Sequence, residues 1–413
     1  MKNLKLLVVA LVAMFGFIAC DKHECNDYDH SSDLVGTWTC LEKDFAEALV
    51  ISADGSVVST GVAFGEYWEN VKGNIVVENG NATMTFEDHD NYKGHFDIIP
   101  GMAFSIYNDE GVRFTYNYCA NDLADEIVGM WVCNDGPLAG NDMSIHTFNE
   151  DGTVLLTGLT PDGNGFIANQ GGNTYKVVGD LLFNVMSGAP EGNGIYACMR
   201  VNIASNGTSL GDIMTTQGYL PVNGTIALTP QSYLRVKQSL DLAGNKYDYI
   251  KTFVTNVDGL DKDINFMGFE FNFAKMDGVK LDKMLKTLLF NVEFPNANTI
   301  KYACHYNNEP MSMDAPIVVD GNKMTIKMST KDAAYKDVDL YTFQDADCSQ
   351  MHMYMPTYAF INFFGNMQAT MMSQMGDLDL TDATAVKAVF DSIDNAVNTI
   401  NVSFVMTKAT KAL

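Results

Sequence analysis

The chain has 413 residues, of which 47% are hydrophobic and 19% charged, a composition typical of a folded protein with roughly two to four domains. Its formal net charge of −25 argues against nucleic acid as a partner, because that binding requires clustered Lys and Arg. Arginine occurs only at Arg113, Arg200 and Arg235, so bidentate recognition of phosphate is scarce as well.

The N-terminus reads as a targeting segment, residues 1–19, and not as part of the fold. Lys2 and Lys5 precede the apolar run Leu6 to Ile18, which is too short to span a membrane and is typical of a signal peptide. The run ends in Phe17-Ile18-Ala19-Cys20, which resembles the lipobox of bacterial lipoproteins. The resemblance implies cleavage before Cys20 and a diacylglycerol on its thiol, which would hold the chain on a membrane. An ordinary signal peptide cut nearby is the alternative.

Residues 20–32 form a polar, acidic stretch that we expect to be a disordered tether. It resembles the acidic tags of Bacteroidetes lipoproteins displayed on the outer face of the outer membrane. We therefore expect an outer-membrane lipoprotein exposed on the cell surface, with a periplasm-facing anchor as the alternative. His23, Cys25 and His30 would bind a metal only if the tether became ordered, so no metal is expected.

A short motif opens two consecutive regions. Leu34 to Cys40 reads LVGTWTC, and Ile127 to Cys133 reads IVGMWVC. After the first copy, short strands are predicted at 34–41, 47–52, 56–62, 73–78, 82–86, 93–98, 103–107 and 112–118, with turns such as Asp54-Gly55 and Pro100-Gly101 between them. These strands predict an antiparallel meander over residues 33–122 that closes into a barrel, because closure removes both exposed edges.

The second copy covers residues 123–229. Its segment Phe148 to Gly158 answers Ile51 to Gly61, and further strands are predicted near 164–168, 174–178, 181–186 and 194–203. Both copies end with an arginine close to a cysteine, at Arg113 with Cys119 and at Arg200 with Cys198. In a closed meander the last strand pairs with the first, so these residues are expected near the opening motif of their own copy.

Gly-x-Trp on a first strand with an arginine on a late strand resembles the calycin superfamily of lipocalin-like barrels. The resemblance implies a mainly β protein with tandem small antiparallel lipocalin-like β-barrels, in which Trp38 pairs with Arg113 and Trp131 with Arg200. A guanidinium over an indole face contributes about 0.5–2 kcal/mol.

Seven cysteines follow Cys20, and export would permit disulfides. No Cys-x-x-Cys pair occurs, which argues against redox and zinc motifs. The predicted disulfides are Cys40–Cys119, Cys133–Cys198 and Cys304–Cys348, which leaves Cys25 in the tether.

Residues 230–413 are predicted to form a larger C-terminal β domain with helical insertions. Strands rich in Phe and Tyr come first, and Val279 to Leu289 has the period of a short amphipathic helix. After further strands, helices are predicted at 358–375 and 381–398, the second with Thr381 as its N-cap and an apolar stripe, before a last strand at 399–407. The stripe is Val386, Val389, Phe390, Ile393 and Val397. This order resembles the C-terminal lipocalin-like domains of Bacteroidetes lipoproteins, in which a helical insertion precedes the closing strand.

Few patterns carry chemistry. Met351, Met353 and Met355 alternate with His352, so a Cu(I) site is conceivable, but a strand would place the histidine on the opposite face, which favours core packing. The histidines at 89 and 95 favour a polar hairpin tip over a cation site. Nucleophile, phosphate-loop and dinucleotide motifs are absent from the sequence, so we expect neither an enzyme nor a cofactor.

Two functional classes remain. The first is a lipid-anchored binding protein for a small apolar or amphipathic ligand, held inside the third domain by aromatic and methionine side chains. The expected lining residues are Phe269, Phe271, Phe273, Met353, Tyr354, Phe360 and Phe363. The second is a non-catalytic structural or interaction module with an envelope protein as partner, because eight-stranded barrels are barely wide enough to hold their own side chains.

Overall fold

The computed structural model describes residues 30–409, apart from gaps at 43–44, 64–65, 79, 88–90, 108–111, 134–143, 160–165, 169–171, 187–194, 206–211, 220–230, 262, 267–268, 276–277, 307–308 and 331–332. The expected signal peptide, Cys20 and most of the expected tether therefore lie outside the described residues. The chain separates into two compact units. The first comprises the described residues up to Cys40, Ala48–Thr60 and Trp68–Cys119, and the second comprises Leu41–Glu47, Gly61–Tyr67 and the described chain from Ala120 onward.

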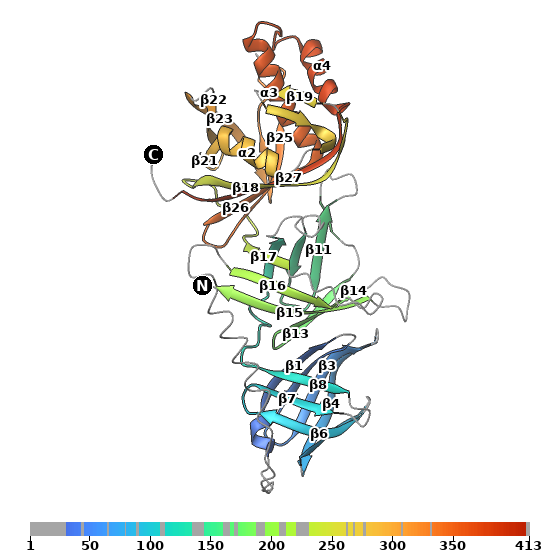
Figure 1. Ribbon diagram of the computed structural model, residues 1–413. Helices are drawn as coiled ribbons and strands as arrows, with labels where there is room; N and C mark the ends of the chain where they lie inside the picture. The colour runs from blue at the N-terminus through green and yellow to red at the C-terminus, as the bar shows by residue number, and fades with distance from the viewer. Residues whose placement is uncertain are drawn as a thin grey trace, which may run out of the picture. The chain divides into compact units, whose positions relative to one another are not determined.

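Residues 36–119 form a closed eight-stranded antiparallel barrel, which confirms the meander expected there (Figure 1). A 3-10 helix, η1 (His30–Leu34), leads into it, and each strand pairs with the next until β8 returns to β1. The strands are β1 (Gly36–Glu42), β2 (Phe45–Ile51), β3 (Ser56–Ala63), β4 (Glu66–Glu78), β5 (Asn81–Phe86), β6 (Tyr92–Ile99), β7 (Ala103–Tyr107) and β8 (Arg113–Cys119).

The opening motif closes one end of this barrel. Trp38 is fully buried, and its indole Nε1 donates to the carbonyl oxygen of Leu34 at 2.6 Å. Trp38 lies opposite Tyr118 in the β1–β8 ladder, and the two rings meet edge to face at 5.1 Å. Gly36 has φ +134°, and a Cβ on it would lie 2.7 Å from the Tyr118 ring. The glycine is required because the ring lies directly against its backbone.

The expected pair between Trp38 and Arg113 is wrong. Arg113 begins β8, opposite Tyr107, so it lies toward the other end of the barrel from Tyr118. Its guanidinium lies 5.6 Å from the centre of the Tyr107 ring, and its Nε donates to Ser105 Oγ at 3.1 Å.

After the first barrel, the chain forms a nine-stranded antiparallel sheet in the order β12-β11-β10-β9-β17-β16-β15-β14-β13. Among the described residues no strand ladder joins β12 to β13, so the sheet is not the closed barrel expected for this region. Its edges approach where Thr153 bridges Thr174 and Val154 N donates to Asn173 O at 3.0 Å. The strands are β9 (Gly129–Cys133), β10 (Ile145–Phe148), β11 (Val154–Leu159), β12 (Phe166–Ala168), β13 (Thr174–Val178), β14 (Leu181–Met186), β15 (Ile195–Ser205), β16 (Asp212–Tyr219) and β17 (Gln231–Val236).

The second copy of the motif has the same local geometry as the first. Trp131 is fully buried and donates from Nε1 to Ile127 O at 2.7 Å, and Gly129 has φ +132°. The hairpin turns correspond as well. Asp54 accepts hydrogen bonds from the hydroxyl and the backbone N of Ser56, and Asp151 accepts from the same two groups of Thr153. These bonds lower the pKa of both carboxyl groups. The two copies are therefore repeats in structure as well as in sequence.

The arginine that covers Trp131 is Arg235, so the expected pair with Arg200 is wrong. Arg235 lies opposite Trp131 in the β17–β9 ladder, with its guanidinium 4.3 Å from the indole. It also donates to Val128 O at 2.6 Å and to Glu126 O. Arg200 lies on β15, which β16 and β17 separate from β9, and it pairs with Asp180. The sheet thus extends through Val236, past the expected boundary at 229.

The third β structure is a closed eight-stranded barrel in the order β18-β21-β22-β23-β24-β25-β26-β27. A hairpin, a 3-10 helix and α2 follow the first strand, and α3 and α4 precede the closing strand, as expected (Figure 1). The elements are β18 (Lys246–Gly259), β19 (Asp263–Phe266), β20 (Phe269–Asn272), η3 (Phe273–Lys275), α2 (Gly278–Leu288), β21 (Leu289–Asn296), β22 (Thr299–Tyr306), β23 (Glu309–Asp320), β24 (Lys323–Ile326), β25 (Val338–Gln344), β26 (Gln350–Met355), α3 (Thr357–Gln374), α4 (Ala383–Asp394) and β27 (Val397–Lys408).

Helix α4 begins one residue later than expected. Asp382 is its N-cap and accepts from Thr384 N and Ala385 N, whereas Thr381 donates to Asp379. Four residues of the predicted stripe are buried in the helix, and the fifth, Val397, begins β27. An aspartate carries a full negative charge to the helix N-terminus, where a threonine would offer only a hydroxyl.

The three predicted disulfides are not formed. Cys198 and Cys348 are buried free thiols, so neither Cys133–Cys198 nor Cys304–Cys348 exists. Topology explains both errors, because β9 is not adjacent to β15, and β22, which carries Cys304, is not adjacent to β25 or β26. Cys40–Cys119 fails on register: the strands are neighbours, but Cys119 lies opposite Thr37.

Candidate functional site at the helical end of the third barrel

The expected lining residues divide into three groups. Phe273, Met353, Phe360 and Phe363 join one core cluster that fills the third barrel and extends under α3. Tyr354 points to the other face of β26 and packs in a separate cluster with Phe343. The side chains of Phe269 and Phe271 lie outside the described residues.

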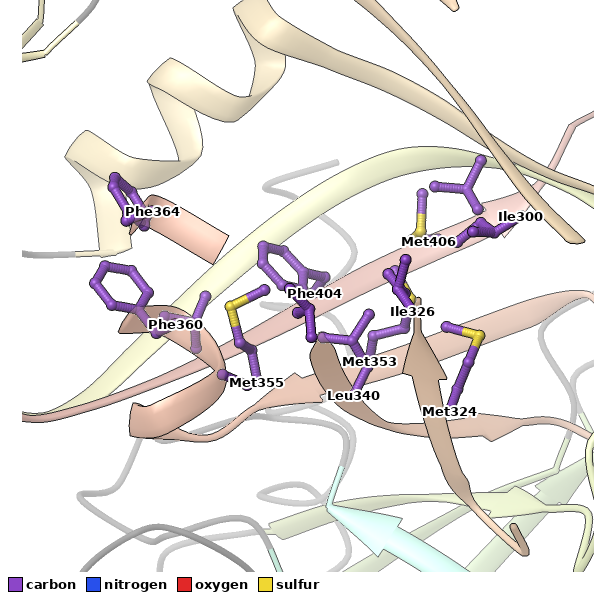
Figure 2. Close-up of a cluster of buried hydrophobic side chains, with 14 of the residues drawn as sticks. Ile300, Met324, Ile326, Leu340, Met353, Met355, Phe360, Phe364, Phe404 and Met406 are labelled. Carbon is purple, nitrogen blue, oxygen red and sulfur yellow. The ribbon is translucent and has the colours of Figure 1, made fainter. Parts of the chain in front are cut away.

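Aromatic side chains pack this end of the barrel. Phe273 of η3 meets Phe360 of α3 edge to face at 6.3 Å, and Phe360 packs on Phe364 at 4.3 Å. Met355 of β26 lies beside Phe360, and Met353 lies farther along the strand beside Leu340, as Figure 2 shows. Phe273, Met353 and Phe360 are buried, so they serve as core residues. The end of the barrel beneath α3 is thus closed by side chains.

At the same end of the third barrel, away from α3, part of the inward face is exposed to solvent. Strand alternation places Met313 on the same face as the buried Ala315 and Ile317, yet Met313 is 44% exposed. It lies opposite Tyr302 of β22, whose hydroxyl donates to the sulfur of Met328 at 3.7 Å. Burial raises the pKa of Tyr302 to about 12, so its hydroxyl stays protonated. Tyr302, Met313 and Met328 are called the Tyr302 cluster below.

A hydrogen-bonded carboxylate holds α2 against β18 near this cluster. Asp282 accepts from Tyr249 OH at 2.6 Å and from Thr252 N at 3.0 Å, and it pairs with Lys286 at 2.8 Å. Partial burial opposes ionisation, but these bonds outweigh it and lower the pKa of Asp282. Burial and the bond to Asp282 raise the pKa of Tyr249. The network fixes the helix, and the two pKa shifts keep Asp282 ionised and Tyr249 protonated near neutral pH.

The opposite end of the barrel is closed by polar groups. Gln344 is fully buried, and its amide donates to Tyr247 OH at 2.8 Å and to Asp241 O at 2.9 Å. Asp241 N donates back to the Gln344 oxygen at 2.6 Å. Cys348 lies nearby, with its sulfur 3.7 Å from Lys237 Nζ. These contacts satisfy buried polar atoms at this end, and burial raises the pKa of the Cys348 thiol.

The methionine-rich strand is core packing on one face. Met351, Met353 and Met355 all belong to the barrel core, and His352 lies on the opposite face of β26. Burial lowers the pKa of His352 to about 4. Three sulfurs and the imidazole therefore cannot meet at one ion. More generally, no group of three or more His, Cys, Asp or Glu side chains within the described ranges has the geometry of a metal site.

No helix among the described residues is long and apolar enough to cross a membrane. Comparison with family models and with curated proteins found no match for this chain. The site must therefore be interpreted from its own geometry.

Sequence reasoning missed Arg235, Tyr118 and the Tyr302 cluster. Arg235 stands in the segment YLRV, which reads equally well as the first strand of a third domain. Tyr118 belongs to no recognised motif, because the calycin resemblance implies an arginine, Arg113, as the partner of Trp38. The Tyr302 cluster joins β22, β23 and the segment after β24, so no single stretch of sequence contains it.

Proposed function

We propose that this protein is a lipid-anchored, non-catalytic interaction module of the bacterial cell envelope, with the lipid on Cys20. The alternative of a ligand enclosed in the third barrel is placed second. One observation carries this order: the described interior of that barrel is occupied by its own side chains.

Packing along the whole length of the third barrel supports the interaction module over an enclosed ligand. Met324 and Met406 lie toward the polar end, Leu340 and Phe404 follow, and Met355 and Phe360 lie toward the helices (Figure 2). Each of these six side chains is less than a tenth exposed. An eight-stranded barrel is only just wide enough to be filled in this way. Recognition would then use outer surfaces and loops on a rigid frame.

A second candidate function rests on the Tyr302 cluster. Half-exposed apolar side chains beside a hydroxyl that has only a weak sulfur acceptor suit a small amphipathic molecule with one polar group. Such a ligand would bind at the rim of the barrel and not inside it.

Metabolic labelling with a palmitate analogue in the native host tests the anchor. The wild-type chain should be labelled and recovered with envelope membranes, and Cys20→Ala should be unlabelled. Protease added to intact cells then distinguishes surface display, in which the chain is digested, from a periplasmic anchor, in which it is protected. An unlabelled wild-type chain would contradict the proposal.

Native mass spectrometry after incubation with an envelope lipid extract separates the two candidates. The interaction module predicts no retained small molecule. An adduct that is lost in Met313→Asp but kept in Val318→Asp would instead favour the rim site. Val318 is the matched control, because it lies on the same strand, faces outward and is 54% exposed.

A further inference from the structure

An exposed apolar surface lies at the end of the first barrel where η1 enters. It consists of Val35, Ile99, Met102 and Tyr118, which are 41%, 58%, 66% and 39% exposed and are called the apolar tip below. The four are contiguous. Met102 N donates to Ile99 O at 3.0 Å, Tyr118 N donates to Met102 O at 2.7 Å, and the Tyr118 ring lies against Gly36, next to Val35.

The turn within the apolar tip does not need its apolar side chains. Ile99-Pro100-Gly101-Met102 has proline second, a glycine with φ +67° third and the closing hydrogen bond, as in a type II turn. Proline and glycine satisfy that backbone whatever flanks them. The turn of the neighbouring hairpin β2–β3 carries Asp54 instead. Isoleucine and methionine at a solvent-facing turn therefore indicate a surface that is covered in use.

Comparison of the two repeats points the same way. The residue opposite the buried tryptophan is Tyr118 in the first barrel and Arg235 in the second sheet. Both side chains cover an indole, so the core accepts either. The copy that follows the N-terminal segment carries the aromatic residue, which suits the boundary between lipid and water.

The chain before η1 limits how far this end of the barrel lies from a lipid on Cys20. Ten peptide steps separate Cys20 from His30 and span at most about 35 Å. We infer that the apolar tip docks on the bilayer surface, with Ile99 and Met102 entering the interface between headgroups and acyl chains. This inference rests on the proposed lipid anchor. The first barrel would then be oriented at the membrane and not merely tethered to it.

Negative charge at the same end of the barrel affects which lipid headgroups the apolar tip can approach. Asp33 lies on η1, Asp54 lies in the β2–β3 turn, and Asp97 lies on β6 close to Ile99. Hydrogen bonds from Ser56 lower the pKa of Asp54, so it is ionised at neutral pH. These carboxylates would be repelled by anionic headgroups. The docking surface is therefore expected to prefer zwitterionic lipid.

A tryptophan placed in the apolar tip tests the inference. The mature lipidated chain carrying Met102→Trp is reconstituted into phosphatidylcholine vesicles with brominated acyl chains, which quench nearby indoles. The added emission should fall by about half, as expected for a side chain in the interface. Ile99→Trp should behave alike, and Val112→Trp is the unquenched control, because Val112 is 45% exposed and lies beside Arg113 at the other end of the same barrel. The native tryptophans at 38, 68 and 131 are at most 9% exposed, so they add a constant background.

The outcomes separate the anchor from the docking. A chain that fails to float with the vesicles overturns the lipid anchor and the docking with it. A chain that floats while its tryptophans at 99 and 102 remain unquenched overturns the docking alone. Replacement of part of the lipid by phosphatidylglycerol should weaken quenching in both variants, and stronger quenching there would overturn the preference for zwitterionic lipid.

Discussion

The first barrel and the second sheet are two copies of one design that differ at the residue covering the tryptophan. Both bury an indole, bond its Nε1 to the carbonyl four residues earlier and require a glycine of positive φ two residues before it. Tyr118 covers Trp38, whereas Arg235 covers Trp131. Both copies therefore need a long side chain that covers the indole, but the chemical type of that side chain differs and can serve a role at the surface.

The largest expected effect comes from the shared tryptophans. Trp38→Ala and Trp131→Ala should each lower the free energy of unfolding of their own unit by about 3–5 kcal/mol, because each leaves a large cavity. Hydrogen exchange followed by mass spectrometry can assign the loss to peptides of one sheet. A uniform loss across all three β structures would contradict the division into separately stabilised copies.

The second effect depends on pH and distinguishes the copies. His146 of β10 corresponds to Leu49 of β2, and its ring is tilted against that of Tyr233, with the ring centres 4.8 Å apart. Burial lowers its pKa from 6.5 to about 4, so the unfolded chain binds a proton that the folded sheet does not. Stability from this group is complete above pH 6.5 and falls between pH 6.5 and 4, by up to about 3 kcal/mol.

His146→Leu introduces the residue that occupies the corresponding position in the first barrel. It should reduce the loss of stability of the second sheet between pH 6.5 and 4. Urea unfolding at pH 7 and pH 4.5, followed by exchange in β10 peptides, measures the difference. His352→Leu is the control, because burial lowers its pKa in the same way but it lies in the third barrel. An unchanged slope in β10 peptides of His146→Leu would show that other groups dominate.

Glycine substitutions sharpen the comparison further. At Gly36 and Gly129 the positive φ alone should make alanine cost about 1–3 kcal/mol. Gly36→Ala should cost more, because its Cβ would lie 2.7 Å from the Tyr118 ring, whereas at Gly129 the nearest atom is the flexible Arg235 Nη1 at 3.1 Å. Thermal unfolding of the two variants checks the order, and Gly101→Ala, with no atom within 4 Å, separates strain from crowding.

The smallest effect concerns the arginines. Arg235→Ala should destabilise the second sheet by about 1–2 kcal/mol, through loss of the cation–π contact and of donors to two carbonyls. Arg200→Ala should cost less than about 1 kcal/mol, since its ion pair with Asp180 is partly exposed to solvent. Equal losses in urea titrations would restore Arg200 as an equivalent partner.

Local patterns predicted the strands of the first barrel, the three helices of the third domain and the place of the helical insertion, because alternation and helical period are properties of short segments. The candidate site was predicted less well. Phe273, Met353, Phe360 and Phe363 do gather, yet Tyr354 lies on the opposite face of its strand, and the exposed Met313 was not singled out. Exposure at a barrel rim depends on neighbouring elements that no single segment encodes.

The sequence by itself determined the repeat, the β architecture and the residues that resemble a lipid-attachment site, since each is written in contiguous residues. Tertiary structure alone decided which arginine covers Trp131, that the predicted cysteine pairs stay apart, and that Val35, Ile99, Met102 and Tyr118 form one surface. The physical reason is register. Which residue faces which across a closed sheet depends on the order and stagger of all its strands, and a shift of one residue reverses every face.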